Sequence, residues 1–411
     1  MDRPAAEKAH RMRIVIVGAG QAAASMAARL RAQGHDGPLT VIGAEPVAPY
    51  QRPPLSKGWL LGQIPMERML LRAPQWWDDQ QIELCTGLRV TAIDRHARQI
   101  VTTDGPLPYD ALALTLGATP RRLPAELGGD LPGTHVIRSL ADIEALAPQM
   151  QPGRRLIVIG GGYIGLEIAA VARKLDLTVT LIEAAPRILA RVAAAETAAM
   201  IRALHGRHGV RILENTPVAR ITGATRADGV ELADGRRLPA DLVVMGIGIH
   251  PETALARTAG LMIDDGIATD EFGRSSHPAI WAAGDCASFP HQGGRLRLES
   301  VGNAIDMGEC VADNMLGAAR PYQAKPWFWS DQFDAKLQIA GISHGHDRIA
   351  TRPGAGAESG SVWYFRQGRL IAVDALDDPR AYMTGKRLIE SGRSPQPDLI
   401  ASAPDLRGLL A

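Results

Sequence analysis

The sequence predicts an α/β protein with two similar parallel-sheet units and an α+β C-terminal region. Two stretches carry this prediction: at 13–31 and again at 155–167, a short apolar strand leads through a glycine-rich turn into a helix. Each unit also ends on an apolar strand followed by glycine and proline, at 109–117 and 241–248. This pattern indicates one architecture used twice rather than a repeat of short period.

Composition narrows the class of protein. A length of 411 residues suggests about three domains. The formal net charge is +1, so overall charge predicts neither a nucleic-acid nor a membrane partner. The first dozen residues lack an apolar core, and no apolar run is long enough to span a bilayer, so we expect no signal peptide and a cytoplasmic location.

The first motif has the features of a dinucleotide-binding turn. Gly18 allows the tight turn, Gly20 lets the backbone approach a pyrophosphate, and Ala23 lets the helix pack closely on the strand. The positive end of the helix then points at the phosphates. The acid expected near the end of the next strand comes late, because Ala44 precedes Glu45, which we predict accepts from a ribose hydroxyl.

The second motif matches the G-x-G-x-x-G pattern at Gly160, Gly162 and Gly165. Glu183 ends the following strand, roughly 20 residues later, where an acid accepts from the adenosine ribose. A carboxylate there repels a 2′-phosphate, which predicts NADH rather than NADPH. Arg187 is a counter-argument, because an arginine can meet a 2′-phosphate.

Three other segments each have a functional and an ordinary interpretation. In 49–57, the functional interpretation is that Arg52 and Lys57 neutralise a pyrophosphate or touch a flavin. The ordinary interpretation is that they are two cations of a solvated loop. The pair Gly284-Asp285 either approaches a ribityl chain or forms a simple turn. The aromatic segment 326–332 either belongs to the core or shields a flavin and contacts a partner.

Periodicity predicts several further elements. Ser139 is expected to cap a helix over 139–149, with Asp142 in its first turn. A last helix is expected at 379–390, preceded by a turn and cap at Asp377-Asp378. Alternation predicts strands at 84–93, 99–103, 336–342, 361–365 and 370–375.

Together these motifs resemble the pyridine-nucleotide flavin reductases over nearly the whole chain. Segments 49–57 (PYQRPPLSK) and 326–332 (PWFWSDQ) resemble ferredoxin reductases of the putidaredoxin reductase and biphenyl dioxygenase reductase type, with apoptosis-inducing factor as a more distant relative. The resemblance implies two Rossmann-like dinucleotide-binding domains of the glutathione-reductase type and an α+β C-terminal domain. The implied bounds are 1–118 with 249–322 for FAD, 119–248 for NADH, and 323–411 for the C-terminal domain.

The resemblance also implies an activity. FAD takes a hydride from NADH and passes single electrons to a two-iron, two-sulfur ferredoxin, which serves a haem-thiolate monooxygenase or a ring-hydroxylating dioxygenase. The ferredoxin is expected to be acidic and to bind transiently, and the reductase to be a monomer or a weak homodimer. No nucleic-acid partner, membrane partner or metal is expected.

The implied site residues fall into three groups. For FAD they are Gly18, Gly20, Ala22, Ala23, Glu45, Arg52, Lys57, Val90, Arg138, Gly284, Asp285 and Val301. For NADH they are Gly160, Gly162, Ile164, Gly165, Glu167, Glu183 and Gly248. Lys57 is expected beside the flavin in a pair with Glu167, and Trp329 near the flavin on the partner side; these three are the implied catalytic residues.

The surface that docks the ferredoxin departs from the pattern of the relatives. Glu309 and Gln338 stand where putidaredoxin reductase has cations. Basic residues elsewhere are alternative docking candidates, because complementary charge guides association with an acidic protein. These candidates are Arg68, Arg72, Arg121, Arg122 and Lys336.

Other functions remain open. A disulfide or peroxide reductase on the same scaffold needs a reactive cysteine near the flavin, but 49–57 has none, and Cys85, Cys286 and Cys310 are interpreted as buried free thiols. An NADH oxidase, a rubredoxin reductase-type flavoenzyme and an NADH- and FAD-binding redox sensor are further alternatives. The pair at 344 and 346 is interpreted as two histidines of a surface turn rather than metal ligands.

Overall fold

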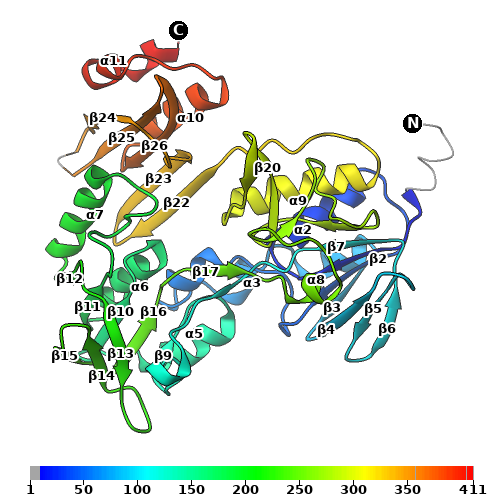
Figure 1. The fold of residues 1–411 in the computed structure, drawn as a ribbon, viewed down its shortest axis with the longest axis horizontal. Helices are drawn as coiled ribbons and strands as arrows, with labels where there is room; N and C mark the ends of the chain where they lie inside the picture. Colours follow the sequence, from blue (N-terminus) through cyan, green and yellow to red (C-terminus); the bar gives the residue numbers. More distant parts are fainter. Residues whose placement is uncertain (1–9, 357, 404, 411) are drawn as a thin grey trace. The chain divides into compact units, whose positions relative to one another are not determined.

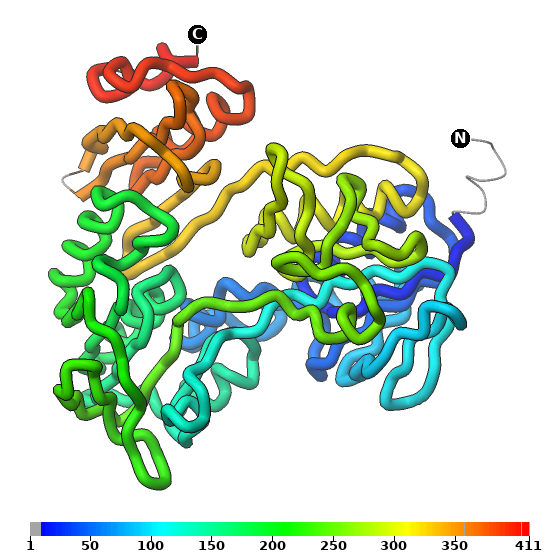
Figure 2. Tube along the Cα trace, in the orientation of Figure 1, coloured from blue at the N-terminus to red at the C-terminus, as the bar shows by residue number. Residues whose placement is uncertain are grey.

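The computed structural model describes residues 10–356, 358–403 and 405–410, which form two compact units. The first unit comprises 10–51, 65–119 and 250–326, and the second comprises 52–64, 120–249 and 327–410. The tube in Figure 2 follows the chain as it leaves the first unit, returns at His250 and leaves again after Pro326. Short strands β8 (Ala118–Pro120) and β17 (Ile249–Pro251) lie at two of these crossings.

The first unit is built on a five-stranded parallel sheet in the order β19-β7-β1-β2-β3. The strands are β1 (Ile14–Val17), β2 (Leu39–Gly43), β3 (Ile82–Thr86), β7 (Ala111–Leu114) and β19 (Ile280–Ala282). Helix α2 (Gln21–Ala32) packs beside α9 (Val301–Met315), as Figure 1 shows. Every residue of β1, β2 and β7 is buried, so this sheet forms the core of the unit and confirms the predicted strand–turn–helix.

Smaller elements complete the first unit. The antiparallel strands are β4 (Val90–Asp94), β5 (Gln99–Thr102) and β6 (Gly105–Pro108), and a second small group is β18 (Ile267–Ala268), β20 (Ala287–His291) and β21 (Gly294–Leu296). The short helices are α3 (Met66–Met69), α4 (Pro74–Asp79) and α8 (Ala254–Thr258). The prediction of one strand over 84–93 was wrong. The chain turns at Gly87, which has a φ of 70°, and β3 and β4 join different sheets.

The second unit repeats the parallel architecture with the strand order β12-β11-β10-β16-β9. Its strands are β9 (Thr134–His135), β10 (Arg155–Ile159), β11 (Thr178–Ile182), β12 (Arg211–Leu213) and β16 (Leu242–Met245). Its helices are α5 (Leu140–Leu146), α6 (Tyr163–Lys174) and α7 (Ala195–Arg207), and an antiparallel group contains β13 (Val218–Thr222), β14 (Gly229–Leu232) and β15 (Arg237–Pro239). Ser139 caps α5 and Asp142 lies in its first turn, as predicted, and the two form a capping box. The predicted helix over 139–149 was too long, because α5 ends at Leu146 and a 3-10 turn, η3 (Ala147–Gln149), follows it.

The C-terminal part of the second unit is an antiparallel sheet in the order β22-β23-β26-β25-β24. Its strands are β22 (Trp327–Gln332), β23 (Ala335–Gly341), β24 (Arg348–Pro353), β25 (Gly360–Arg366) and β26 (Arg369–Leu376). The helical elements are α10 (Pro379–Glu390), α11 (Pro397–Ser402) and the 3-10 turn η4 (Leu406–Leu410). The last helix has its predicted bounds, and the carboxylate of Asp378 accepts from the amide of Ala381 at 3.0 Å.

The α/β fold class is therefore as predicted. Strand β24 was not predicted, because it is an edge strand that exposes much of its length and ends on a proline. None of the helices in the described ranges is both long and apolar enough to cross a membrane.

Candidate functional site

The first glycine turn has the shape that a phosphate-binding backbone needs. Gly18 has a φ of 103°, and a Cβ there would collide with the carbonyl oxygen of Thr115. A Cβ at Gly20 would meet no atom of the described chain within 4 Å, so space remains open in front of the first turn of α2. That turn carries no acidic side chain, which leaves its amides and positive dipole available to an anion.

The other predicted residues of the first unit gather at the same edge of its sheet. The register pairs Val17 with Leu114 and Leu114 with Ala282, so the carboxyl ends of three strands lie level. Gly284 follows the third of them with a φ of 79°, and a Cβ there would lie 3.2 Å from the Cβ of Ala22. Ala23 is buried, Asp285 is half-buried, and Val301 begins α9. The carboxyl edge of a parallel sheet is where such sheets bind ligands.

Glu45, the predicted ribose acid, is the second residue after β2. Ala44 is exposed, whereas Glu45 is half-buried and its carboxylate accepts a hydrogen bond from the Tyr50 hydroxyl at 2.6 Å. The carboxylate is therefore held near the end of β2, where a ribose acid belongs. Val90, also half-buried, begins β4 and packs against the core of the first unit.

The second glycine turn repeats the construction. Gly160 has a φ of 105°, and a Cβ there would collide with the carbonyl oxygen of Gly246. A Cβ at Gly165 would collide with the carbonyl oxygen of Gly160, so only glycine permits this close packing of helix on strand. Gly162 faces open space and Ile164 is 42% exposed, so the first turn of α6 is accessible.

Glu183 is fixed at the end of β11. One carboxylate oxygen accepts from the amide of Gly161 at 2.7 Å, and the other accepts from the amide of Ala185 at 2.7 Å. The guanidinium of Arg187 donates instead to the carbonyl oxygens of Ile188 and Ala193, at 3.3 and 2.7 Å. The carboxylate of Glu183 therefore lies against the glycine turn, while the guanidinium of Arg187 is bound by carbonyl oxygens of the residues that follow it.

Gly248 follows the last parallel strand of the same sheet. It has a φ of 103°, and a Cβ there would lie 3.6 Å from the guanidinium of Arg191 and 3.8 Å from the side chain of Arg121. Two cations thus flank the backbone at this predicted NADH residue.

Lys57 and Glu167 form the ion pair that the resemblance implied. The ammonium of Lys57 lies 2.7 Å from Oε2 of Glu167, and the side chains are 19% and 2% exposed, respectively. The hydroxyls of Ser56 and Ser330 donate to the two carboxylate oxygens at 2.5 and 2.7 Å. Burial raises the pKa of Glu167, while Lys57 and the hydroxyl donors act in the opposite direction.

Sequence reasoning missed both serines. Ser56 directly precedes Lys57, and Ser330 directly follows Trp329, so each lay inside a segment already selected for another residue. A buried carboxylate needs several donors, and this requirement was the available signal.

Two more of the predicted cations lie together in the second unit. The guanidinium of Arg52 donates to the carbonyl oxygen of Arg138 at 2.6 Å. The amide of Arg138 in turn donates to the carboxylate of Asp142 at 3.1 Å, just before α5. Both arginines are half-buried.

The aromatic segment is not plain core. Trp327, Phe328 and Trp329 are all half-buried. The rings of Trp327 and Trp329 stack at 5.6 Å between centroids, and the ring of Phe328 lies 4.7 Å from that of Tyr163 at the start of α6. Trp329 thus stacks on Trp327 and directly precedes Ser330, which donates to Glu167.

The cysteines lack the features of a redox-active pair. Cys286 is fully buried and burial raises its pKa to about 11, while Cys310 is buried and its pKa is also raised. Cys85 is only half-buried, and burial again raises its pKa. These thiols stay protonated near neutral pH, unlike the thiolate that disulfide chemistry needs.

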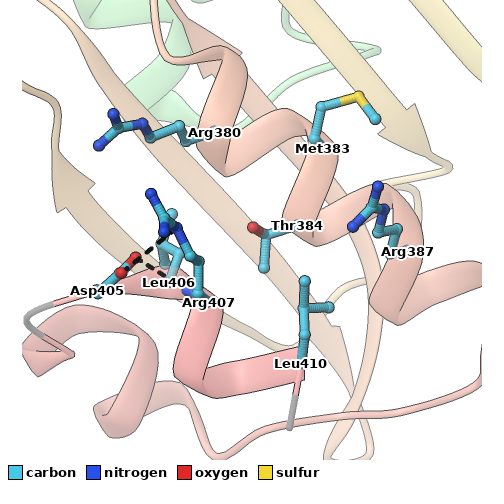
Figure 3. Close-up of a pocket in the computed structure, with 8 residues that line it drawn as sticks. All are labelled: Arg380, Met383, Thr384, Arg387, Asp405, Leu406, Arg407 and Leu410. Atoms are coloured by element: carbon cyan, nitrogen blue, oxygen red, sulfur yellow. Dashed lines mark hydrogen bonds and ion pairs between the residues drawn. The ribbon is translucent and has the colours of Figure 1, made fainter.

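Two other features do not coincide with the predicted site. Within the described residues, no three histidine, cysteine or acidic side chains are grouped to hold a metal ion. A pocket of about 320 Å³ lies between α10 and η4, as Figure 3 shows, with Arg380, Arg387 and Arg407 around Met383 and Leu410. None of the predicted site residues lines this pocket.

Comparison with known proteins agrees with this geometry. Residues 12–308 match the family model of pyridine nucleotide-disulphide oxidoreductases, and 327–410 match the reductase C-terminal model. Rhodocoxin reductase of Rhodococcus erythropolis is 41% identical over 92% of this chain and 89% of its own. Putidaredoxin reductase of Pseudomonas putida is 40% identical over 94% of both chains. The crystal structure of the covalent putidaredoxin reductase–putidaredoxin complex matches with a TM-score of 0.93 and 39% identity, covering 97% of this chain and 98% of that chain.

Proposed function

Because the chain belongs to the pyridine nucleotide-disulphide oxidoreductase family, we propose that it is an NADH-dependent ferredoxin reductase of an oxygenase system. Relatives of that activity align over almost the whole chain, including the C-terminal domain. The observation that carries the proposal is the buried Lys57–Glu167 ion pair, because Glu167 lies on the helix that begins at the second glycine turn. The raised thiol pKa values count against disulfide chemistry.

The residues present fit the family's two cofactors, FAD and NADH. When bound, FAD supplies the ability to accept two electrons as a hydride and to release them one at a time. In the first unit, Gly18 and Gly20 open the helix end to a pyrophosphate, and Glu45 offers a carboxylate to a ribose. Gly284, Asp285 and Val301 would complete that edge of the sheet.

In the second unit, the glycine turn and Glu183 would bind NADH. The fixed carboxylate would accept from a 2′-hydroxyl and repel a 2′-phosphate, and Arg187 is engaged with backbone carbonyls. This arrangement supports NADH over NADPH.

Lys57 and Glu167 would act on the reaction through charge and position. Glu167 holds the Lys57 ammonium at 2.7 Å. This positioned cation would stabilise negative charge that develops on a reduced cofactor beside it. Arg52, Arg138 and Trp329 remain predicted cofactor contacts, each held by the neighbours described above.

The partner that we propose is an acidic two-iron, two-sulfur ferredoxin that binds transiently. Its docking candidates share exposure and positive charge: Arg68, Arg72, Arg121, Arg122 and Lys336. Complementary charge of this kind speeds encounter and is sensitive to salt. The three-domain division, a cytoplasmic location and a monomeric or weakly dimeric state belong to the same proposal.

The experiment is NADH-driven reduction of a two-iron ferredoxin, followed through cytochrome c. NADPH and a small disulfide are tested in parallel. Fast ferredoxin-dependent transfer with NADH preferred supports the proposal, whereas turnover of the disulfide contradicts it. Charge reversal at the docking candidates is expected to reduce the salt dependence of transfer.

A further inference from the structure

A row of buried polar side chains leads from Glu167 to a histidine on α7. The hydroxyl of Ser330 lies 2.7 Å from Oε1 of Glu167, and Nε2 of Gln332 lies 3.1 Å from the Ser330 hydroxyl. Oε1 of Gln332 then lies 2.8 Å from Nε2 of His205. The four side chains belong to α6, β22 and α7 of the second unit, and each residue is at most 2% exposed.

The charge on Glu167 determines the direction of every hydrogen bond in this row. An ionised carboxylate only accepts, so the single proton of Ser330 points to Glu167. The Ser330 oxygen must then accept from the amide nitrogen of Gln332, which turns the amide oxygen towards His205. His205 can satisfy that oxygen only by carrying a proton on Nε2.

His205 suits this role because it is neutral. Burial lowers its pKa to about 4, and within the described residues its Nδ1 has no hydrogen-bond partner. The imidazole is therefore neutral at neutral pH and carries one proton, which the amide oxygen of Gln332 places on Nε2. The charged group that faces Glu167 is Lys57. The ionisable neighbour of His205 is His208, and the rings of both histidines contact Phe333.

We propose that His205 and Gln332 are positioning residues for the Lys57–Glu167 pair, with His205 fixing the amide of Gln332 so that Ser330 donates to Glu167. Without the His205 donor, the amide of Gln332 is free to rotate by half a turn. Its oxygen would then face Ser330 and draw the hydroxyl proton away from Glu167. The proposal rests on the proposed function, because it assigns His205 and Gln332 to the same catalytic ion pair.

The first test measures the pH dependence of flavin reduction by NADH in rapid mixing. Ser330→Ala removes a donor to the ionised form of Glu167, so its pKa rises by about one unit, and the acidic limb of the profile moves to higher pH. Gln332→Met and His205→Leu, which remove a hydrogen-bonding group without adding charge, are expected to shift the acidic limb of the profile in the same direction by a smaller amount. His205→Gln keeps an N–H near the place of Nε2 and is expected to restore the wild-type profile.

Ser361→Ala is the matched control, because Ser361 is a buried serine of the same C-terminal sheet that accepts from the indole of Trp363. The acidic limb of the pH profile of Ser361→Ala is expected to coincide with that of the wild type. Equal shifts in this control, or failure of His205→Gln to restore the profile, would show a general structural effect and overturn the proposal. Thermal unfolding of each variant confirms that the compared proteins are folded.

The second test does not need the activity. Nitrogen-15 NMR of the histidine rings, recorded on the purified protein without added NADH, reports which ring nitrogen carries the proton. We expect His205 to remain the neutral Nε2–H form from pH 5 to 8 in the wild-type protein. An Nδ1–H form or an imidazolium would overturn the inference while leaving the proposed function intact. Absence of NADH oxidation would contradict the function but not this ring assignment.

Discussion

The two glycine turns have the same backbone geometry, but the helices that follow them carry different side chains. In both, a positive-φ glycine lies against a backbone carbonyl, of Thr115 in the first and of Gly246 in the second. The side chains at equivalent positions of the two helices differ. Five residues after Gly20, helix α2 has Ser25, which accepts from Gln21. Five residues after Gly162, helix α6 has the buried Glu167. The two turns thus share their backbone geometry, whereas the helix after the second turn also carries a buried carboxylate in an ion pair.

The acids that follow the two turns differ as well. Glu45 comes late and accepts from the Tyr50 hydroxyl, whereas Glu183 ends its strand and accepts from two backbone amides. Backbone amides of the glycine turn and of the residues after the strand fix the second acid. We expect cofactor discrimination to depend on it, and retention of the other cofactor to depend only partly on Glu45.

The largest expected effect comes from Gly18→Ala or Gly160→Ala. Each places a Cβ against a carbonyl oxygen at a positive φ, so we expect a loss of roughly 3 kcal/mol in unfolding free energy and weak binding of the corresponding cofactor. Thermal unfolding and flavin content measure the two effects. Gly20→Ala is the control for stability alone, since its Cβ meets no atom of the described chain within 4 Å; an equal loss of unfolding free energy in all three variants would contradict the account.

The next effect is that of Lys57→Ala. Removing the cation leaves Glu167 buried without its ion-pair partner, so flavin reduction by NADH should slow roughly tenfold or more, or FAD should be retained less well. Rapid-mixing absorbance and flavin content provide the measurement. Ser25→Ala, at the equivalent place in the first helix, should leave both nearly unchanged. Wild-type kinetics and full flavin in Lys57→Ala would remove Lys57 from the mechanism.

A smaller effect is expected for Glu183→Ala. Loss of a charged acceptor should reduce the preference for NADH over NADPH by about tenfold, read from the two kcat/KM values. Glu45→Ala serves as the counterpart in the first unit and should leave this ratio unchanged. A ratio that moves only in Glu45→Ala would reverse the assignment of the two turns.

The smallest expected effect concerns pH. Asp110 accepts the backbone amide of Arg13, whereas Asp241 accepts both the amide and the guanidinium of Arg155. Arg155 lowers the pKa of Asp241 from 3.8 to about 2, so this carboxylate stabilises the fold above its ordinary pKa and ceases to do so as the pH falls towards 2. The Tm difference between wild type and Asp241→Asn should shrink over that range, and a constant difference would contradict the assignment.

Local features were predictable from the sequence, and distant ones were not. The glycine turns, the capping box at Ser139 and the last helix depend on neighbouring residues, and the structure contains all three. The contact between Ser330 and Glu167 joins residues 163 positions apart and depends on how β22 packs on α6. The break between β3 and β4 was missed because alternation continues through the turn at Gly87.

The most direct test of the central claim is an anaerobic transfer experiment. The protein is reduced with one equivalent of NADH and mixed with an oxidised two-iron ferredoxin in excess, and both absorbance spectra are followed. The account predicts that the flavin is reoxidised as two ferredoxin molecules are reduced for each NADH, and that NADPH supports the reaction poorly. A parallel sample of the reduced protein is mixed with a small disulfide instead of ferredoxin. A flavin that passes electrons to the disulfide rather than to ferredoxin would contradict the account.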